Sequence, residues 1–272
     1  MPPPRWGIAR RLFAIDILTM AFVIALGGGT IARFAQIPDW PIVVMTCAAI
    51  AVIVPLLGWL RTHLDVAPMR VLHDWSFAFC VYAIYRMVLL VAVPGHSGQL
   101  FDAWYLSADR WLFGGDPAVW FAAVAHPVVT QTLEWAYAMF YLLPLAVAVE
   151  IYASGREWRF RQWAFVCGCG FFATYAGYLV MPAAGPRFAF AGGQTVVTLL
   201  SVAWAWRYRL RVRWVITVVG ALLLVGTVYL RYHYVADVLG GVALAILCLA
   251  LAPLVHGWLA GHLGTLDADR TA

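Results

Sequence analysis

Long apolar segments alternate with short polar ones along the whole chain. Eight of these segments have the length and hydrophobicity of a helix that crosses a bilayer, which needs about 20 apolar residues. They cover residues 15–31, 41–60, 75–93, 128–151, 163–181, 190–206, 214–230 and 235–254. The pattern predicts an all-α, polytopic membrane protein with about eight transmembrane helices.

The polar segments between these spans are too short to form a separate soluble domain. No charge block or low-complexity tract indicates a linker. We therefore expect one integral membrane domain over residues 1–272, with two N-terminal spans in about 1–72, a core over about 73–258 and a tail at 259–272. No cleavable signal segment precedes the first span, so this span is expected to direct insertion.

The composition indicates that the chain is embedded in a lipid bilayer. Hydrophobic residues make up 64% of the 272 positions and charged residues 11%, and the mean hydropathy is +0.83. A soluble domain of this size could not bury so much apolar surface. An ordinary soluble globular protein is therefore excluded.

The distribution of basic residues predicts the orientation. All 18 are arginine, and most lie in the two tails and in the second, fourth and sixth loops. This bias places both termini in the cytoplasm. We expect the protein to reside in the bacterial inner (plasma) membrane. It also explains the net charge of +5, so no nucleic-acid partner is expected.

His233 and Asp237 are the strongest candidates for chemistry. They lie four residues apart, about one helical turn, so the carboxylate can reach the imidazole. A carboxylate bound to one ring nitrogen fixes the tautomer and leaves the other nitrogen able to attack or to accept a proton. A purely structural hydrogen bond is the alternative.

The loops predicted to lie outside the cell hold the other unusual residues. Arg187 in the fifth loop and Arg231 in the seventh could clamp an anion, because arginine matches phosphate geometry. His233 could then attack phosphorus. The alternative for each arginine alone is contact with lipid headgroups.

The third loop, residues 94–127, is rich in aromatic and acidic residues and is expected to form amphipathic helices in the membrane interface. Its acids Asp102, Asp109 and Asp116 could bind a headgroup hydroxyl, although helix capping and turn formation are the more ordinary roles.

Four segments carry a resemblance to a known family. They are His73-Asp-Trp, Asp109-Arg-Trp-Leu-Phe-Gly-Gly-Asp-Pro, Pro182-Ala-Ala-Gly-Pro-Arg and Val228-Tyr-Leu-Arg-Tyr-His-Tyr-Val-Ala-Asp-Val-Leu-Gly-Gly. With them the chain resembles the type 2 phosphatidic acid phosphatase superfamily, in particular its inositol phosphorylceramide synthase-like branch.

The resemblance implies a phosphatase-like helical bundle over about 73–258. It makes His233 the nucleophile, Asp237 its orienting partner and Arg187 a phosphate ligand. It also implies that no metal or other cofactor is needed.

The chain departs from the family pattern at two places. Gly226-Thr227 stands where the final motif usually has Ser-Arg, and Arg231 is the candidate to compensate. The middle motif, usually Pro-Ser-x-His, aligns with Ala191-Gly-Gly-Gln194, so Gln194 replaces the histidine that would protonate the leaving group. The loop before it is short, which leaves open that part of this segment has been lost.

The missing histidine matters because general acid catalysis contributes about 10²–10⁴-fold and a neutral amide cannot deliver a proton. Either the enzyme favours lipid diphosphates, whose leaving group is good, or another residue supplies the proton, or catalysis has been lost.

The sequence therefore predicts a phosphatase or phosphotransferase that forms a phosphohistidine. We expect it to act on a lipid phosphate or diphosphate at the outer face of the membrane. Membrane lipids are expected to surround it as partners. Water as acceptor makes it a hydrolase, and an inositol-like or sugar alcohol makes it a transferase. The expected site has catalytic His233 and Asp237 and phosphate-binding Arg187, Arg231 and Gln194. Gln194 favours the alternative, a catalytically impaired lipid-phosphate binder, scaffold or transporter.

Overall fold

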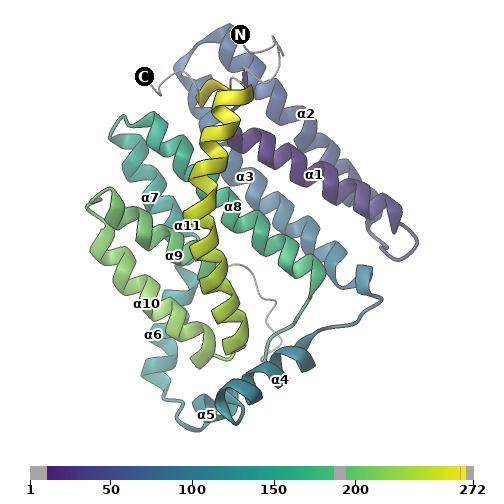
Figure 1. Cartoon of the computed structure of the whole chain (residues 1–272), viewed down its shortest axis with the longest axis vertical. Coiled ribbons are helices and arrows are strands. Elements are labelled where there is room, and N and C mark those ends of the chain that lie inside the picture. Colours follow the sequence, from purple (N-terminus) through teal and green to yellow (C-terminus); the bar gives the residue numbers. More distant parts are fainter. Residues whose placement is uncertain (1–10, 187–193, 264, 268–272) are drawn as a thin grey trace. The chain divides into compact units, whose positions relative to one another are not determined.

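The computed structural model describes residues 11–186, 194–263 and 265–267 (Figure 1). Within these ranges the regular structure is helical, with no β-strand. The helices are α1 (Ala14–Ala32), α2 (Trp40–Leu64), α3 (Ala67–Ala92), the short 3-10 helix η2 (Pro94–His96), α4 (Asp102–Phe113), α5 (Pro117–Ala123), α6 (Pro127–Ala138), α7 (Leu142–Ala153), α8 (Glu157–Val180), α9 (Gln194–Arg207), α10 (Arg213–Tyr229) and α11 (Val235–Leu263).

Proline and glycine mark several helix ends. Proline occupies the first turn of α2, α3, α5 and α6, where its missing N–H would have no intrahelical partner in any case. Helix α4 ends at Phe113, and the next residue, Gly114, has a left-handed φ of 72°. Glycine adopts that conformation without the penalty that a Cβ imposes.

Each predicted span overlaps a helix, but fewer helices than expected are long enough to cross a membrane. Among the described residues, five helices are long and apolar enough: α1, α2, α3 extended through η2, α8 and α11. The sixth candidate is α6 with α7, which meet at a bend of 46°. Helix α9 has 14 residues and α10 has 17, short of the length that spans a bilayer. The protein is a polytopic helical membrane protein, and its described residues contain five or six candidate spans.

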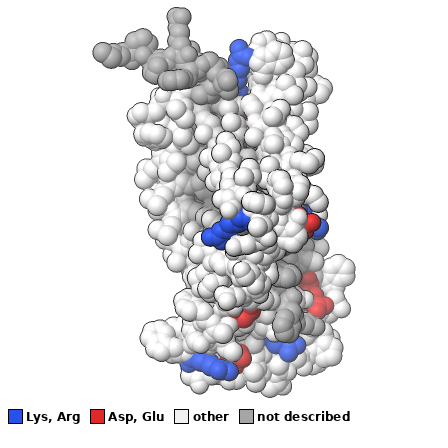
Figure 2. All heavy atoms as spheres, turned by 90° about the vertical axis from the view of Figure 1, so that its right-hand side faces the viewer, with Lys and Arg blue, Asp and Glu red and all other residues white. Residues whose placement is uncertain are grey.

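The surface of the long helices is apolar, as contact with lipid requires. Met45 in α2, Phe79 in α3 and Leu254 in α11 are 71%, 72% and 68% exposed. Figure 2 shows one face of the molecule, on which few atoms belong to charged residues. Apolar side chains at such exposure are stable where the surrounding medium is hydrocarbon.

The chain forms two compact units, and α8 and α11 each contribute to both. Unit 1 contains Met1–Gly98, Glu157–Phe172 and Ala250–Ala272, and unit 2 contains Gln99–Arg156 and Ala173–Leu249.

In unit 1, α1 packs against α2 and α3. A buried polar cluster lies at one end of these helices, where His73 Nε2 is 2.9 Å from Asp16 Oδ2 and Arg61 is paired with Asp74 at 2.5 Å. The C-terminal segment joins this end, because Asp267 accepts a 2.7 Å hydrogen bond from the Ala14 N–H.

In unit 2, α10 packs against α5, α6 and α9, and α9 also packs against α7. Helix α11 approaches α9 closely at Gly241, where an added Cβ would lie 2.8 Å from Cβ of Thr195. Only glycine allows that approach without a shift.

Hydrogen bonds inside unit 2 join loops that the charge bias assigns to the same side. Phe101 of the third loop donates its N–H to Pro182 O of the fifth loop at 2.8 Å. At the other set of loops, Glu150 accepts from the N–H groups of Arg211 and Val212 at 2.6 and 3.1 Å. Within unit 2, therefore, the third loop contacts the fifth loop, and the end of α7 contacts the sixth loop.

Candidate active site

The turn between α10 and α11 places His233 directly before a helix. The carbonyl of Thr227 accepts hydrogen bonds from the N–H groups of Tyr232 and His233, both at 3.0 Å. Arg231 lies within this turn with φ of 63°, a left-handed conformation that non-glycine residues seldom adopt and that functional sites often contain. The tight turn therefore fixes His233 against the first turn of α11.

His233 and Asp237 form the pair that the sequence predicts. Nδ1 of His233 lies 2.5 Å from Oδ2 of Asp237, and the two side chains are 3% and 36% exposed. Because a carboxylate can only accept, Nδ1 carries a proton in this contact, and in the neutral imidazole the lone pair is then on Nε2. Nε2 is buried and has no hydrogen-bond partner among the described residues.

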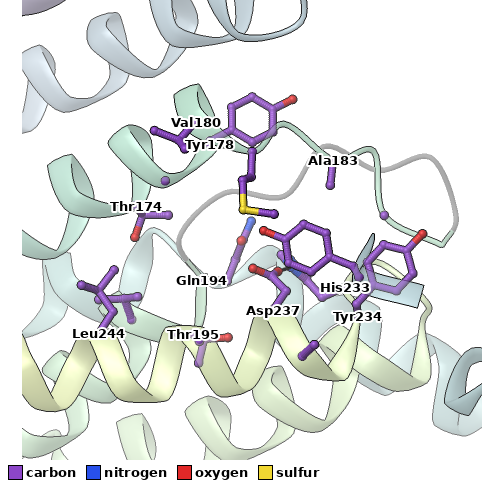
Figure 3. A pocket seen from close by; sticks show the side chains of 18 of the residues that line it. Thr174, Tyr178, Val180, Ala183, Gln194, Thr195, His233, Tyr234, Asp237 and Leu244 are labelled. Atoms are coloured by element: carbon purple, nitrogen blue, oxygen red, sulfur yellow. Dashed lines mark hydrogen bonds and ion pairs between the residues drawn. The ribbon is translucent and has the colours of Figure 1, made fainter. Parts of the chain in front are cut away.

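A cavity of about 340 Å³ opens beside this pair in unit 2. Figure 3 shows His233 and Asp237 on one side of it, with Gln194 of α9 close to them and Tyr178 of α8 across the space. Aromatic side chains form much of the wall: Trp104, Tyr105, Tyr178, Tyr232 and Tyr234. The volume suits a small polar group together with part of an apolar one.

Gln194 begins α9 and lines the same cavity. Its Nε2 donates a 3.0 Å hydrogen bond to the hydroxyl of Tyr137. The ring of Tyr137 lies with its centroid 6.5 Å from that of His233 and 4.8 Å from that of Tyr232. Gln194, where the sequence analysis expected a second histidine, therefore lines the same cavity as His233 and carries an amide there.

Two acids of the third loop hold the site together. Asp109 accepts from the N–H groups of Val235 and Ala236 at 3.0 and 2.7 Å and thereby caps α11 from another helix. Asp102 accepts from the N–H groups of Ala184 and Gly185 at 3.1 and 2.9 Å. It also accepts from the Tyr234 hydroxyl at 3.0 Å.

The third acid, Asp116, has a local role. It accepts from Ala118 N–H at 2.9 Å and caps its own helix α5. Sequence reasoning recognised capping as the ordinary role of these acids but missed that Asp102 and Asp109 act across the fold. Their seven-residue spacing, which places both on one helical face, was the available signal.

Burial changes the acidity of groups around the cavity. It raises the pKa of Tyr105 to about 12, with Asp237 and Asp102 adding to the shift. The pKa of Tyr234 is raised by burial first and then by Asp102. Burial also raises the pKa of Asp109, against the two backbone hydrogen bonds that lower it. Both phenols therefore remain protonated at neutral pH.

The structure gathers only part of the expected phosphate-binding set. Gln194 lines the cavity, whereas Arg231 does not. Arg187 lies outside the described residues. Thr227, where the family motif usually has arginine, is buried and donates to Leu224 O at 2.6 Å. The described lining of the cavity therefore contains no arginine or lysine.

Metal-binding residues are not gathered in the described ranges. No three His, Cys, Asp or Glu side chains within them come together in a way that could hold a metal ion. The arrangement offers instead one oriented imidazole with a free nitrogen, which is suited to nucleophilic attack.

Comparison with known proteins gives one match. No curated protein and no solved structure matches the chain. Residues 103–201 match the family model of the PAP2 superfamily, a region that includes Asp109, Arg187 and Gln194 and ends before His233. This match supports a phosphatase-type function.

Proposed function

We propose that the protein transfers a phosphoryl group from a lipid phosphate or diphosphate through a phosphohistidine at His233. The observation that carries this proposal is how the two nitrogens of the His233 imidazole are engaged. Nδ1 is engaged by Asp237, while Nε2 is buried, unpartnered among the described residues and part of a residue lining the cavity. An unpaired buried polar atom is costly, so its retention here favours a functional role.

In the first step the Nε2 lone pair attacks phosphorus, and the leaving oxygen departs with the electron pair of its P–O bond. The imidazole becomes cationic, and Asp237 stabilises it through the Nδ1–H bond. In the second step an acceptor oxygen attacks the phosphohistidine, the P–N bond breaks and its electrons return to Nε2. The proton of the acceptor passes to solvent.

Gln194 favours a diphosphate as the physiological substrate. A lipid monoester must expel an alkoxide, which needs a proton from a general acid. A diphosphate can expel phosphate or a phosphate ester, which is a far better leaving group. Since the Gln194 amide can donate a hydrogen bond but cannot deliver a proton, the good leaving group compensates for the absent acid.

Water and an alcohol are both possible acceptors chemically, and they give a phosphatase and a phosphotransferase, respectively. The aromatic wall of the cavity, including Tyr105, Tyr232 and Tyr234, could accommodate the ring of an inositol-like or sugar acceptor. We assign the site to the extracytoplasmic side of the bacterial inner membrane, with both termini cytoplasmic. The arginine bias and the grouping of the loops support this assignment.

Two observations favour a second candidate, a lipid-phosphate binder, scaffold or transporter without catalysis. Gln194 occupies the position of the second histidine, and the described cavity wall has no arginine or lysine. Such a protein would bind the anion without forming a covalent intermediate.

Trapping the phosphoenzyme distinguishes these candidates. The full chain in lipid nanodiscs would be incubated with a prenyl diphosphate labelled with ³²P at its terminal phosphate, and then quenched in alkali, which preserves phosphohistidine. We expect label on the wild type and none on His233→Ala. Wild-type protein that binds the lipid but neither acquires label nor releases phosphate would refute the enzyme and favour the binder.

A further inference from the structure

We infer that α4 is a clamp in which Asp102 and Asp109 are positioning residues for two different parts of the active site. The inference rests on the proposed function. It assigns Asp102 to the substrate-binding wall and Asp109 to the helix that carries the partner of the nucleophile.

The contacts of α4 come from one face of the helix. Asp102, Tyr105 and Asp109 are separated by three and four residues, so they lie above one another on successive turns. Tyr105 stacks on Tyr234 with ring centroids 5.6 Å apart and an interplanar angle of 9°. All three residues therefore contact the segments around His233.

Asp102 joins the fifth loop to the turn that bears the nucleophile. Its Oδ2 accepts from Ala184 N–H, and its Oδ1 accepts from Gly185 N–H and from the Tyr234 hydroxyl. Gly185 lines the cavity, and this segment directly precedes Arg187 in the sequence. Because hydrogen bonds to a charged acceptor are among the strongest in proteins, Asp102 fixes the cavity wall relative to Tyr234, the neighbour of His233.

Asp109 controls the first turn of α11. Its two carboxylate oxygens accept from Val235 and Ala236, whose N–H groups have no partner within the helix. Asp109 is only 2% exposed, so water cannot readily replace it. Asp237 lies in the same turn, and its carboxylate must point at His233 Nδ1.

This division of roles predicts different kinetic defects. Without the Asp102 contacts, the wall beside the substrate is free to shift, which weakens binding. Without the Asp109 contacts, Asp237 no longer holds the imidazole in place, which slows attack. A displacement of about 1 Å at a reacting group can cost about 10²-fold in rate.

Three isosteric variants of the full chain test this inference: Asp102→Asn, Asp109→Asn and the control Asp116→Asn. Asparagine keeps one acceptor oxygen. Asp102 and Asp109 use both of theirs, whereas Asp116 uses only Oδ1 for its cap on Ala118. The control therefore keeps its hydrogen bond while removing the same charge.

The measurements are KM for a prenyl diphosphate, the inhibition constant of inorganic phosphate, the single-turnover rate of phosphoenzyme formation at saturating substrate, and the thermal midpoint of unfolding. For Asp102→Asn we expect KM and the phosphate inhibition constant to rise roughly tenfold or more, with a smaller change in rate. For Asp109→Asn we expect the rate to fall about 10- to 100-fold, with the phosphate inhibition constant unchanged. Asp116→Asn should match the wild type in all three kinetic measurements.

Identical kinetics for Asp102→Asn and Asp116→Asn would overturn the role of Asp102. The division of roles would be overturned if Asp102→Asn and Asp109→Asn changed the same kinetic parameter, each in proportion to its loss of thermal stability. If Asp102→Asn does not fold, Tyr234→Phe removes only one donor to Asp102 and should raise KM, whereas an unchanged KM would count against the clamp. Full activity in His233→Ala would refute the proposed function itself, independently of these results.

Discussion

Nδ1 of His233, in the turn before α11, lies 2.5 Å from Oδ2 of Asp237, in the first turn of α11. Because the pair is local in sequence, its geometry depends on the helix and on what holds the first turn of that helix. The buried Nε2 on the other side of the ring has no hydrogen-bond partner among the described residues.

Asp237→Asn should lower kcat for a lipid diphosphate by about 10²-fold or more, since the amide removes the charge that stabilises the imidazolium and can itself donate to Nδ1. Steady-state kinetics of the variant in nanodiscs would measure this change in kcat. The phosphoenzyme should still form slowly. A kcat within twofold of the wild type would assign the His233–Asp237 bond a structural role alone.

Gln194→His should restore a proton donor beside His233. We expect hydrolysis of a lipid monophosphate to increase by about 10²-fold or more and hydrolysis of the matching diphosphate to change little. The control is Gln194→Asn, which keeps an amide. Equal effects of the histidine substitution on both substrates would argue against a missing general acid.

Gly241→Ala should destabilise the protein by about 1–3 kcal/mol, because its Cβ would approach the Cβ of Thr195 to 2.8 Å. The neighbouring residue is a matched control. At Gly240 an added Cβ meets nothing within 4 Å, so Gly240→Ala should be neutral or stabilising by up to about 1 kcal/mol. Unfolding midpoints of the two purified variants, measured in the same detergent, would show the difference in stability between Gly241→Ala and Gly240→Ala.

Alkaline pH should destabilise the native state through Tyr105 and Tyr234. Burial is the largest cause of the raised pKa of each phenol, and that of Tyr105 reaches about 12 from an ordinary value of 10.0. The folded protein therefore keeps protons that the unfolded chain loses. Stability from these groups is complete below pH 10 and declines as pH rises through the folded pKa. Unfolding midpoints between pH 8 and 12 should fall less steeply in Tyr105→Phe than in the wild type, and parallel curves would contradict this.

Orientation can be tested by labelling from one side of the membrane. In a chain whose native cysteines are replaced by alanine, Trp111→Cys in α4 should react with a membrane-impermeant maleimide in intact bacterial cells. Arg209→Cys should react only after permeabilisation. Both positions are exposed in the structure, with Trp111 83% exposed. The reverse pattern would place the site on the cytoplasmic side.

Much of the fold could be predicted from the sequence, because lipid leaves few alternatives. A backbone in hydrocarbon must satisfy its own hydrogen bonds, so apolar segments such as 41–60 and 235–254 become helices. The His233–Asp237 contact was also predicted from the four-residue spacing, although His233 lies in the turn before α11 and is positioned by that turn. Among the described residues five or six helices reach the length of a span where about eight were expected, because α9 and α10 are short there and α6 and α7 are separated by a bend.

Only the tertiary structure decided the contacts between residues that are distant in the chain. Gln194 meets Tyr137 across 57 positions, Asp102 meets Tyr234 across 132, and Asp109 meets Val235 across 126. Sequence spacing could show that Asp102 and Asp109 share a helical face but not which backbone groups they would bind. Those partners depend on how α4 packs against the fifth loop and α11, since the unpaired N–H groups of a helix N-terminus donate to any carboxylate that packing brings near.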